Sequence, residues 1–407
     1  MAHATLLAAG SNACGQLGNG STEDSRIFQP ASFTGHPTGD LPEVPLDLSS
    51  GANHTLVLLR ADPNFSELWG SGDGTAGQMG PNIKSSTAVF TPILLRGLEG
   101  RYCRLIQASW QTSYAVYTAE GQPDVLISMG ADDFGDLGVG KQKKGNSAGY
   151  HIVNLDQLLE DIDRSTVRVD WLAAGPHHVV LRLSAAHRNA SHRKAFIIGW
   201  GACRHGQLGN ITFEGKPPAF VDTPRIILID EPSDPIEKCA IGHHHTVLLR
   251  RSGRISCLGS NRKSQISGMD DRTNVEAVGC TWHGTYAVDS LDGSIHGSGS
   301  NIHGQLGQGT TAPETSMPSL VRLPPSSTHR LKELSCGSEH ILAKLQRTNG
   351  PARTEVWGWG WNEHGNLGTG GLEDVLAPAK IWPPEGAETR EILGIWCGLA
   401  TSWIATV

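Results

Sequence analysis

The chain has 407 residues, of which 38% are hydrophobic and 18% charged, and this composition excludes a disordered or fibrous protein. Its net charge of -7, without a long block of like charges, argues against direct binding of nucleic acid or of an anionic membrane surface. No apolar run approaches the roughly 20 residues that span a bilayer, and no secretion signal is recognisable, so we expect a cytoplasmic protein with the nucleus as a second location.

Two short motifs alternate along the whole chain. A glycine-rich nonapeptide reads GSNACGQLG at residues 10–18, and further copies begin at residues 72, 130, 201, 259, 299 and 360. The second motif reads GANHTLVL at 51, SWQTSYAV at 109, GPHHVVLR at 175, GHHHTVLL at 242, TWHGTYAV at 281, GSEHILAK at 337 and GLATSWIA at 398. Seven interleaved copies of each predict a repeat protein with units of about 58 residues, the fifth of them shortened.

Short apolar runs between turn residues predict strands throughout the chain. In chain order, these runs lie at residues 5–10, near 28, and at 54–60, 67–72, 90–95, 104–108, 114–118, 125–130, 170–174, 178–183, 195–201, 220–228, 237–241, 245–251, 254–260, 276–280, 294–300, 319–323, 332–336, 356–361, 392–397 and 402–407. Each unit thus supplies up to four strands, and the nonapeptide is the turn between the third and the fourth. Four strands repeated seven times predict a β-propeller.

The fold class predicted is all-β, a seven-bladed β-propeller of four-stranded antiparallel blades. The segments at the two chain ends together have the length that separates the motifs elsewhere, so we expect the last blade to be closed by pairing of the N- and C-terminal strands. Closure of this kind removes exposed strand edges.

Several connections are longer than the rest. Residues 1–407 are interpreted as a single propeller domain with loop insertions near 81–104, 141–169, 183–196 and 210–237. Within one insertion, residues 154–163 place Leu155, Leu158, Leu159 and Ile162 at helical spacing, so a short amphipathic helix is expected there.

No catalytic, cofactor or metal site is predicted. Gly72, Gly74 and Gly77 spell G-x-G-x-x-G, but this stretch coincides with the repeat and opens no helix. The eight cysteines include no C-x-x-C pair, so we expect reduced thiols.

The histidines of the second motif are interpreted as structural. Those at its fourth position lie on different blades, where they cannot converge on one ion, and we expect each to bond an adjacent turn: His54, His178, His245 and His340. Residues 243–245 are all histidine, but neighbours on a strand point to opposite faces, so this run is interpreted as architectural too.

Tryptophans and arginines in the turns are the candidate partner-binding residues. Trp110 and Trp282 lie between the first and second strands of their units, and Trp361 lies between the third and fourth. In an antiparallel blade these turns emerge at the same end, so the three rings are expected to share one face. Arg204 and Arg262 occupy equivalent turns of other blades. Tryptophan and arginine often dominate protein interfaces.

The motifs G-x-N-x-x-G-Q-L-G and G-x-x-H-T resemble the regulator of chromosome condensation repeat over essentially the whole chain. The resemblance implies a seven-bladed propeller without a single fixed activity, because the family includes nucleotide exchange factors for a nuclear GTPase, ultraviolet photoreceptors and fungal scaffold proteins. The photoreceptors carry a G-W-R-H-T stretch that is missing from the motif positions of this sequence, so photoreception is not expected.

Within the family, the layout is most similar to that of the fungal alpha-tubulin suppressor, also called a killer toxin insensitivity protein. That resemblance implies a non-catalytic scaffold, a monomeric propeller that forms a heterodimer with a small metal-binding protein. The partner serves diphthamide synthesis and the Elongator pathway of wobble-uridine modification in transfer RNA. Two alternatives remain open: guanine nucleotide exchange on a small GTPase, and binding of chromatin or histones.

Overall fold

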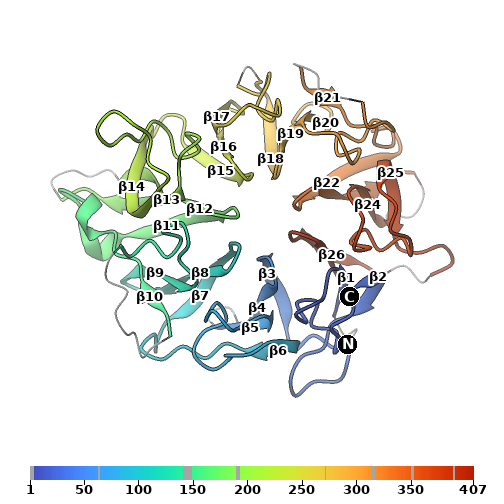
Figure 1. Cartoon of the computed structure of the whole chain (residues 1–407), viewed down its shortest axis with the longest axis horizontal. Coiled ribbons are helices and arrows are strands. Elements are labelled where there is room, and N and C mark those ends of the chain that lie inside the picture. Colours follow the sequence, from blue (N-terminus) through green and yellow to red (C-terminus); the bar gives the residue numbers. More distant parts are fainter. Residues whose placement is uncertain are drawn as a thin grey trace.

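The computed structural model describes residues 4–62, 65–140, 149–188, 193–270, 272–312, 317–349, 353–387 and 390–407. Residues 141–148 and 189–192, which belong to two of the predicted insertions, lie outside the described residues. The described chain forms seven antiparallel sheets arranged as blades around a central axis, with the first strand of each blade innermost (Figure 1). The predicted all-β, seven-bladed propeller is therefore confirmed. No helix of the described residues is long and apolar enough to cross a membrane.

The strands of the first four blades after the N-terminal segment are β3 (Val44–Ser50), β4 (His54–Asp62), β5 (Phe65–Gly72) and β6 (Thr87–Pro92); β7 (Tyr102–Ala108), β8 (Thr112–Ala119), β9 (Gln122–Gly130) and β10 (His151–Ile152); β11 (Arg168–Ala174), β12 (His178–Ala186), β13 (Arg193–Ala202) and β14 (Phe220–Asp230); and β15 (Ile236–Ile241), β16 (His245–Arg250) and β17 (Ile255–Gly259). The next two blades contain β18 (Val275–Thr281), β19 (Gly284–Asp289), β20 (Ile295–Gly299) and β21 (Ser319–Leu320), and then β22 (His329–Cys336), β23 (His340–Arg347), β24 (Thr354–Gly360) and β25 (Val375–Trp382).

The seventh blade is built from both ends of the chain, as predicted. Its strand order is β2 (Ser25–Pro30), β1 (Thr5–Gly10), β27 (Thr401–Thr406) and β26 (Ile392–Cys397). β1 and β27 pair along their full length, from Thr5 opposite Thr406 to Gly10 opposite Thr401. The N- and C-terminal strands thus lie side by side in one sheet, which closes the ring (Figure 1).

The blade of β15–β17 departs from the four-stranded prediction, since it has three strands among the described residues. Its nonapeptide begins at 259 and the next at 299, the shortest spacing in the chain, which leaves too little length for a fourth strand. The Asp270 carboxylate accepts a hydrogen bond from the Cys257 backbone N–H on the outer side of β17, at 2.7 Å. A side chain thereby satisfies part of the strand edge that a fourth strand would otherwise pair.

Polar side chains inside the nonapeptide explain its composition. In the first copy, Asn12 Oδ1 accepts from the Leu17 backbone N–H at 2.9 Å, and Gln16 Oε1 accepts from the Cys14 N–H at 3.0 Å. The equivalent first bond is made by Asp132, Asn261, Asn301 and Asn362. Gly18 has a φ of 62°, and a Cβ there would lie 2.5 Å from the Phe90 ring of the next blade. The turn is therefore fixed internally and packs tightly against the neighbouring blade.

The fourth-position histidines join neighbouring blades. Each is fully buried, and its Nε2 lies 2.9 to 3.1 Å from a hydroxyl on the second strand of the next blade, in the pairs His54–Ser113, His178–Thr246, His245–Thr285 and His340–Ser402. Their structural interpretation is confirmed, but the partner is the neighbouring blade rather than an adjacent turn. A side chain at the first residue of the second strand of a blade therefore points toward the boundary with the next blade.

The expected amphipathic helix at residues 154–163 is not formed. The segment contains only a 3-10 turn, η1 (Asp156–Leu158), and a second such turn, η2 (Arg164–Thr166), follows it. Asp161 has a φ of 56°, which a right-handed helix cannot accommodate. Leu155, Leu159 and Ile162 instead cover the hydrophobic core of the β11–β14 blade. The apolar spacing reflects this packing of a loop onto a sheet.

Candidate protein-binding face

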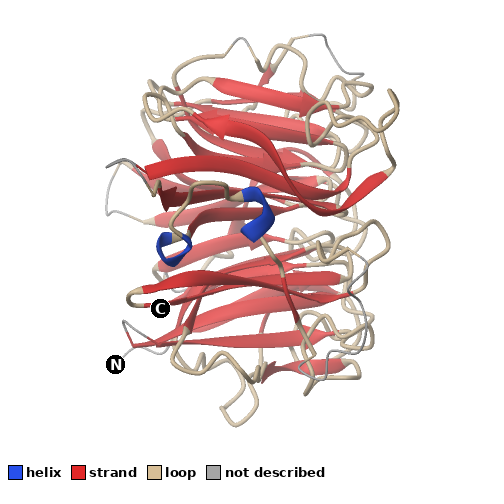
Figure 2. Cartoon of the chain, turned by 90° about the vertical axis from the view of Figure 1, so that its left-hand side faces the viewer, coloured by secondary structure: helices blue, strands red, loops and turns tan. Residues whose placement is uncertain are grey.

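Both sequence motifs lie at one end of the ring. We call this the motif end: it consists of the turns at residues 51–53, 109–111, 175–177, 242–244, 282–283, 337–339 and 398–400 together with the nonapeptide turns. Because β1 begins and β27 ends at the opposite end, both termini lie away from the motif end (Figure 2). A molecule that binds the motif end therefore lies away from the two ends of the described chain.

Backbone hydrogen bonds connect the turns of the motif end from blade to blade. The Ala52 N–H donates to the Trp110 carbonyl at 2.9 Å, and the Trp110 N–H donates to the Pro176 carbonyl at 3.1 Å. Further around the ring, the His243 N–H donates to the Trp282 carbonyl at 3.0 Å and the Trp282 N–H to the Ser338 carbonyl at 2.7 Å. These bonds hold the turns in fixed positions, so the side chains that they carry form a preorganised surface.

Trp110 and Trp282 meet near the central axis. They lie in the β7–β8 and β18–β19 turns, on blades that are not neighbours, yet their ring centroids are 6.2 Å apart. Trp110 is 37% exposed, and Trp282 is half-buried. The pair places a broad aromatic surface at the centre of the motif end.

Trp361 lies beside Trp282 across a pocket. This pocket has a volume of about 430 Å³, and both indole rings line it together with Ile302, His303 and Glu339. The Trp361 backbone N–H donates to the Glu339 carbonyl at 2.9 Å, which fixes the turn. The three tryptophans selected from the sequence are thus brought together at one end of the ring.

Arg204 and Arg262 lie on a different part of the motif end. Both are exposed, and they flank His205 rather than the tryptophans. Burial lowers the pKa of His205, and the charges of Arg262 and Arg204 lower it further. The two arginines therefore form a positively charged margin of this face, separate from the pocket.

Histidines gather around the tryptophans. The His243 ring lies 5.7 Å from that of Trp282, 4.0 Å from His244 and 6.0 Å from His283, measured between centroids. Nδ1 of His283 lies 2.8 Å from Glu339 Oε1. Burial lowers the pKa values of His243 and His244 to about 4, and the surrounding imidazoles add to this effect. Both side chains are accordingly neutral at neutral pH.

The premise that the neighbours in residues 243–245 point to opposite faces of a strand is wrong for His243 and His244. His243 and His244 precede β16 and lie in a bend, where the alternation of a strand does not apply, and their rings stack on the same side. Only His245, the first residue of β16, turns inward to the blade boundary. The change from bend to strand at this position explains the difference.

Sequence reasoning did not select the histidines and the carboxylate that surround the tryptophans: His177, His243, His244, His283, His303 and Glu339. The available signal was their position, since all but His303 occupy the two places that precede the second strand of a unit. These places point to the motif end, whereas the fourth position of the motif points into the blade boundary.

A family model for the regulator of chromosome condensation (RCC1) repeat matches residues 292–343 and 355–402. The chain is similar to the ultraviolet-B receptor UVR8 of Arabidopsis thaliana, with 26% identity over 93% of this chain and 79% of the receptor. It is also 26% identical to the secretion-regulating guanine nucleotide exchange factor of Mus musculus, over 98% of this chain and 83% of that protein. Together with the seven-bladed ring, these matches support the class of an RCC1-repeat propeller.

Solved structures agree with this fold assignment. Human WBSCR16 superposes with a TM-score of 0.69 at 17% identity, over 100% of this chain and 99% of that one. Prp20p of Saccharomyces cerevisiae, the yeast RCC1, superposes with a TM-score of 0.71 at 16% identity in its complex with Kap60, over 100% of this chain and 89% of that one. At such identities the likeness concerns the fold alone.

Proposed function

We propose that this chain is a non-catalytic protein-interaction scaffold that docks a small protein partner on its motif end. The observation that carries the proposal is the arrangement of Trp110, Trp282 and Trp361 on turns held by interblade hydrogen bonds, with a pocket of about 430 Å³ between the last two. Anchoring a partner's side chain in such a preformed aromatic pocket costs little conformational entropy on the scaffold side.

The pocket lining indicates what kind of side chain it accepts. Trp282 and Trp361 offer aromatic surface, and the pocket also contains the carboxylates Glu339 and Glu363 against one cation, Lys263. Aromatic faces and carboxylates together favour an apolar or basic side chain. We therefore expect a partner that inserts a lysine, an arginine or a long apolar residue.

The finer identity of the partner rests on the resemblance described for the sequence. We propose that it is the small metal-binding protein that serves diphthamide synthesis and the Elongator pathway, bound as a heterodimer in the cytoplasm, with the nucleus as a second location. The rigid turns and the aromatic centre support protein docking in general. The subfamily layout supports this particular partner.

The test is affinity purification of the tagged protein from its native cells, with quantification of co-purifying proteins by mass spectrometry. Trp361→Asp places a charge in the pocket and should reduce recovery of the partner by about tenfold or more. Leu291→Asp is the matched control, because Leu291 is an apolar residue that is 80% exposed in the β19–β20 turn at the opposite end. The same proteins recovered with both variants would overturn the proposal.

Guanine nucleotide exchange on a small GTPase is the second candidate function. The relative from Mus musculus that covers 98% of this chain is described as a guanine nucleotide exchange factor, and this favours the candidate. It predicts accelerated release of a fluorescent guanine nucleotide from a member of a small-GTPase panel, with loss of the acceleration in Trp361→Asp. Release rates that stay at their basal values across the panel would exclude it.

A further inference from the structure

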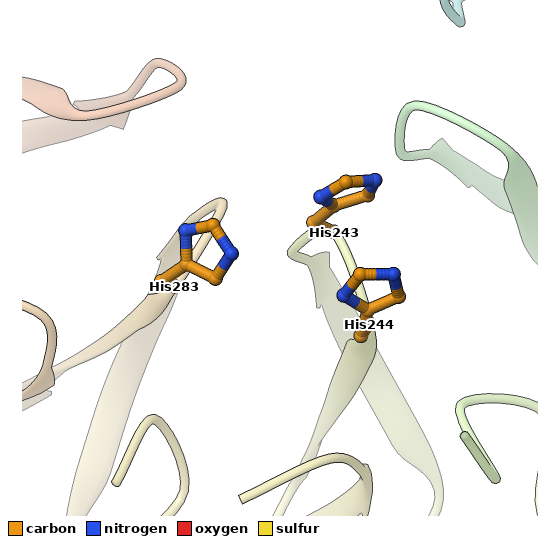
Figure 3. A group of neighbouring side chains, drawn as sticks. All are labelled: His243, His244 and His283. Atoms are coloured by element: carbon orange, nitrogen blue, oxygen red, sulfur yellow. The ribbon is translucent and has the colours of Figure 1, made fainter. Parts of the chain in front are cut away.

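Two turns of neighbouring blades bring three imidazoles together at the motif end. His243 and His244 lie between β15 and β16, and His283 lies between β18 and β19. One ring nitrogen from each lies within 4.8 Å of the others. Figure 3 shows the His283 ring facing the two rings of the adjacent turn. The three residues converge from two blades on a common point.

The backbone holds both turns in place. The His243 N–H donates to the carbonyl of Trp282, the residue before His283, at 3.0 Å. The carbonyl of His244 accepts from the Ser260 N–H at 2.8 Å. The distance between the two turns is therefore fixed, and only side-chain rotation is needed to adjust the imidazoles.

Glu339 orients the third imidazole. Glu339 Oε1 lies 2.8 Å from His283 Nδ1, and Oε2 accepts from Gln305 Nε2 at 2.7 Å. With Nδ1–H donated to the carboxylate, the lone pair of His283 Nε2 is free to bind another group. In protein metal sites, a histidine that binds the ion through one ring nitrogen commonly donates the other N–H to a carboxylate.

We propose that His243, His244 and His283 form a binding site for a divalent transition-metal ion that prefers imidazole, of the Zn²⁺ class. At Zn–N distances of 2.0 to 2.1 Å, tetrahedral geometry places ligand nitrogens about 3.4 Å apart, so half-buried side chains must approach one another by about 1.5 Å at most. Three histidines leave a fourth position for solvent or for a group of a bound molecule. The Glu339 carboxylate offsets part of the cation's charge, and exposed Arg262 on the neighbouring turn opposes it.

The proposal is tested by titrating the untagged, chelator-treated protein with Zn²⁺ in a calorimeter. We expect saturation at a single ion per chain. His243→Ala, His244→Ala and His283→Ala should each weaken Zn²⁺ binding by more than roughly 100-fold. Glu339→Gln removes only the carboxylate that orients His283 and should weaken binding by roughly 10- to 100-fold. His364→Ala is the matched control, since its Nδ1 also lies beside a carboxylate, Asp24 at 2.6 Å, on another part of the motif end. Its affinity should equal that of the unaltered protein.

The controls distinguish metal binding at this site from metal binding by other histidines and from docking of the proposed partner. Circular dichroism without metal checks that each variant is folded, and glutamine variants replace any that is not. The titration contains no partner protein, so metal binding stands or falls independently of docking. The absence of saturable binding, an affinity in all three alanine variants equal to that of the unaltered protein, or loss of binding in His364→Ala would each overturn the proposal.

Discussion

Adjacent histidines in the same motif have opposite environments. His178 is fully buried, and its Nε2 lies 3.0 Å from Thr246 Oγ1 of the next blade. His177 is half-buried at the motif end, where its ring lies beside those of Trp110 and Phe134. His245 and His244 repeat the difference. One short motif therefore serves two purposes: its fourth position joins blades, and the position before it supplies a surface that varies from blade to blade.

The hydrogen-bond partners also define the protonation state of the buried set. Thr246 donates its hydroxyl proton to the Gln207 carbonyl at 2.8 Å, so Nε2 of His178 must carry the proton that joins the two side chains. Its Nδ1 is buried and has no hydrogen-bond partner among the described residues. A second proton on that ring would be a buried donor with no acceptor, which is costly.

The largest expected effect is acid destabilisation through the buried histidines. Burial lowers the pKa of His54 and His340 to about 4 and that of His178 to about 3, whereas unfolded histidine titrates near 6.5. Between pH 6.5 and about pH 4, the unfolded state binds protons that the folded state does not. The free energy of unfolding is therefore at its full value above pH 6.5 and decreases as the pH falls toward 4. At about 1.4 kcal/mol per pH unit and residue, these three histidines should together lower the free energy of unfolding by about 6 kcal/mol at pH 5.

Urea unfolding at several pH values measures this effect. His54→Gln removes one titrating group, so its free energy of unfolding should fall by about 2 kcal/mol less between pH 7 and pH 5 than that of the unaltered protein. An equal pH dependence in both proteins would show that the buried histidines do not cause acid destabilisation.

The number and spacing of the repeated motifs predicted the architecture, because the number of blades and the closure of the ring follow directly from them. Seven interleaved motifs led to seven blades, and the lengths of the two end segments led to closure between β1 and β27. Local spacing was a poorer guide inside the loops. Leu155, Leu159 and Ile162 have helical periodicity, but they lie in a loop that packs onto a sheet. The positive φ of Asp161 bends the backbone of this loop. Periodicity reports which residues are buried and does not distinguish a helix from a loop that lies on a core.

The candidate site was predicted only in part. The turn type places Trp110, Trp282 and Trp361 at one end, and the structure has them there. Their contacts were not predictable, since Trp110 and Trp282 belong to separated blades and meet only because the ring brings their turns to the axis. The cluster of His243 and His283 likewise depends on the distance between two turns. No pattern along the chain encodes that distance.

A second test of the difference between the buried fourth-position histidine and the residue before it is to substitute the glycine that begins the motif. A Cβ on Gly51 would lie 2.3 Å from both His54 Cε1 and the Ser109 carbonyl oxygen, so Gly51→Ala must displace the buried ring and the next blade. We expect a loss of about 3 kcal/mol in the free energy of unfolding, measured by urea denaturation. Gly371 also lies outside the positive-φ region, and the nearest atoms of the described chain lie 4.0 Å from an added Cβ. Gly371→Ala should therefore be neutral or slightly stabilising, and equal losses in the two variants would contradict the packing argument.

The smallest effect, and the sharpest comparison, comes from the adjacent pair itself. His178→Ala leaves a cavity at the blade boundary and removes the donor to Thr246, so we expect the free energy of unfolding to fall by about 2 kcal/mol. His177→Ala removes a half-buried ring whose Nδ1 lies 3.7 Å from Asp136 Oδ1, and the expected loss is smaller, below about 1 kcal/mol. Thermal and urea unfolding of both variants at neutral pH give the two values.

On the surface of the motif end, His177→Ala should have a larger effect than His178→Ala. His177 contacts Trp110 at 5.9 Å between ring centroids, so its removal changes the aromatic centre of the motif end and should alter the intrinsic fluorescence of the folded protein. His178→Ala should leave the folded-state fluorescence nearly unchanged while it lowers stability. If both variants lost the same stability, the fourth position would not be the specific blade-joining site, and the division of labour within the motif would have to be abandoned.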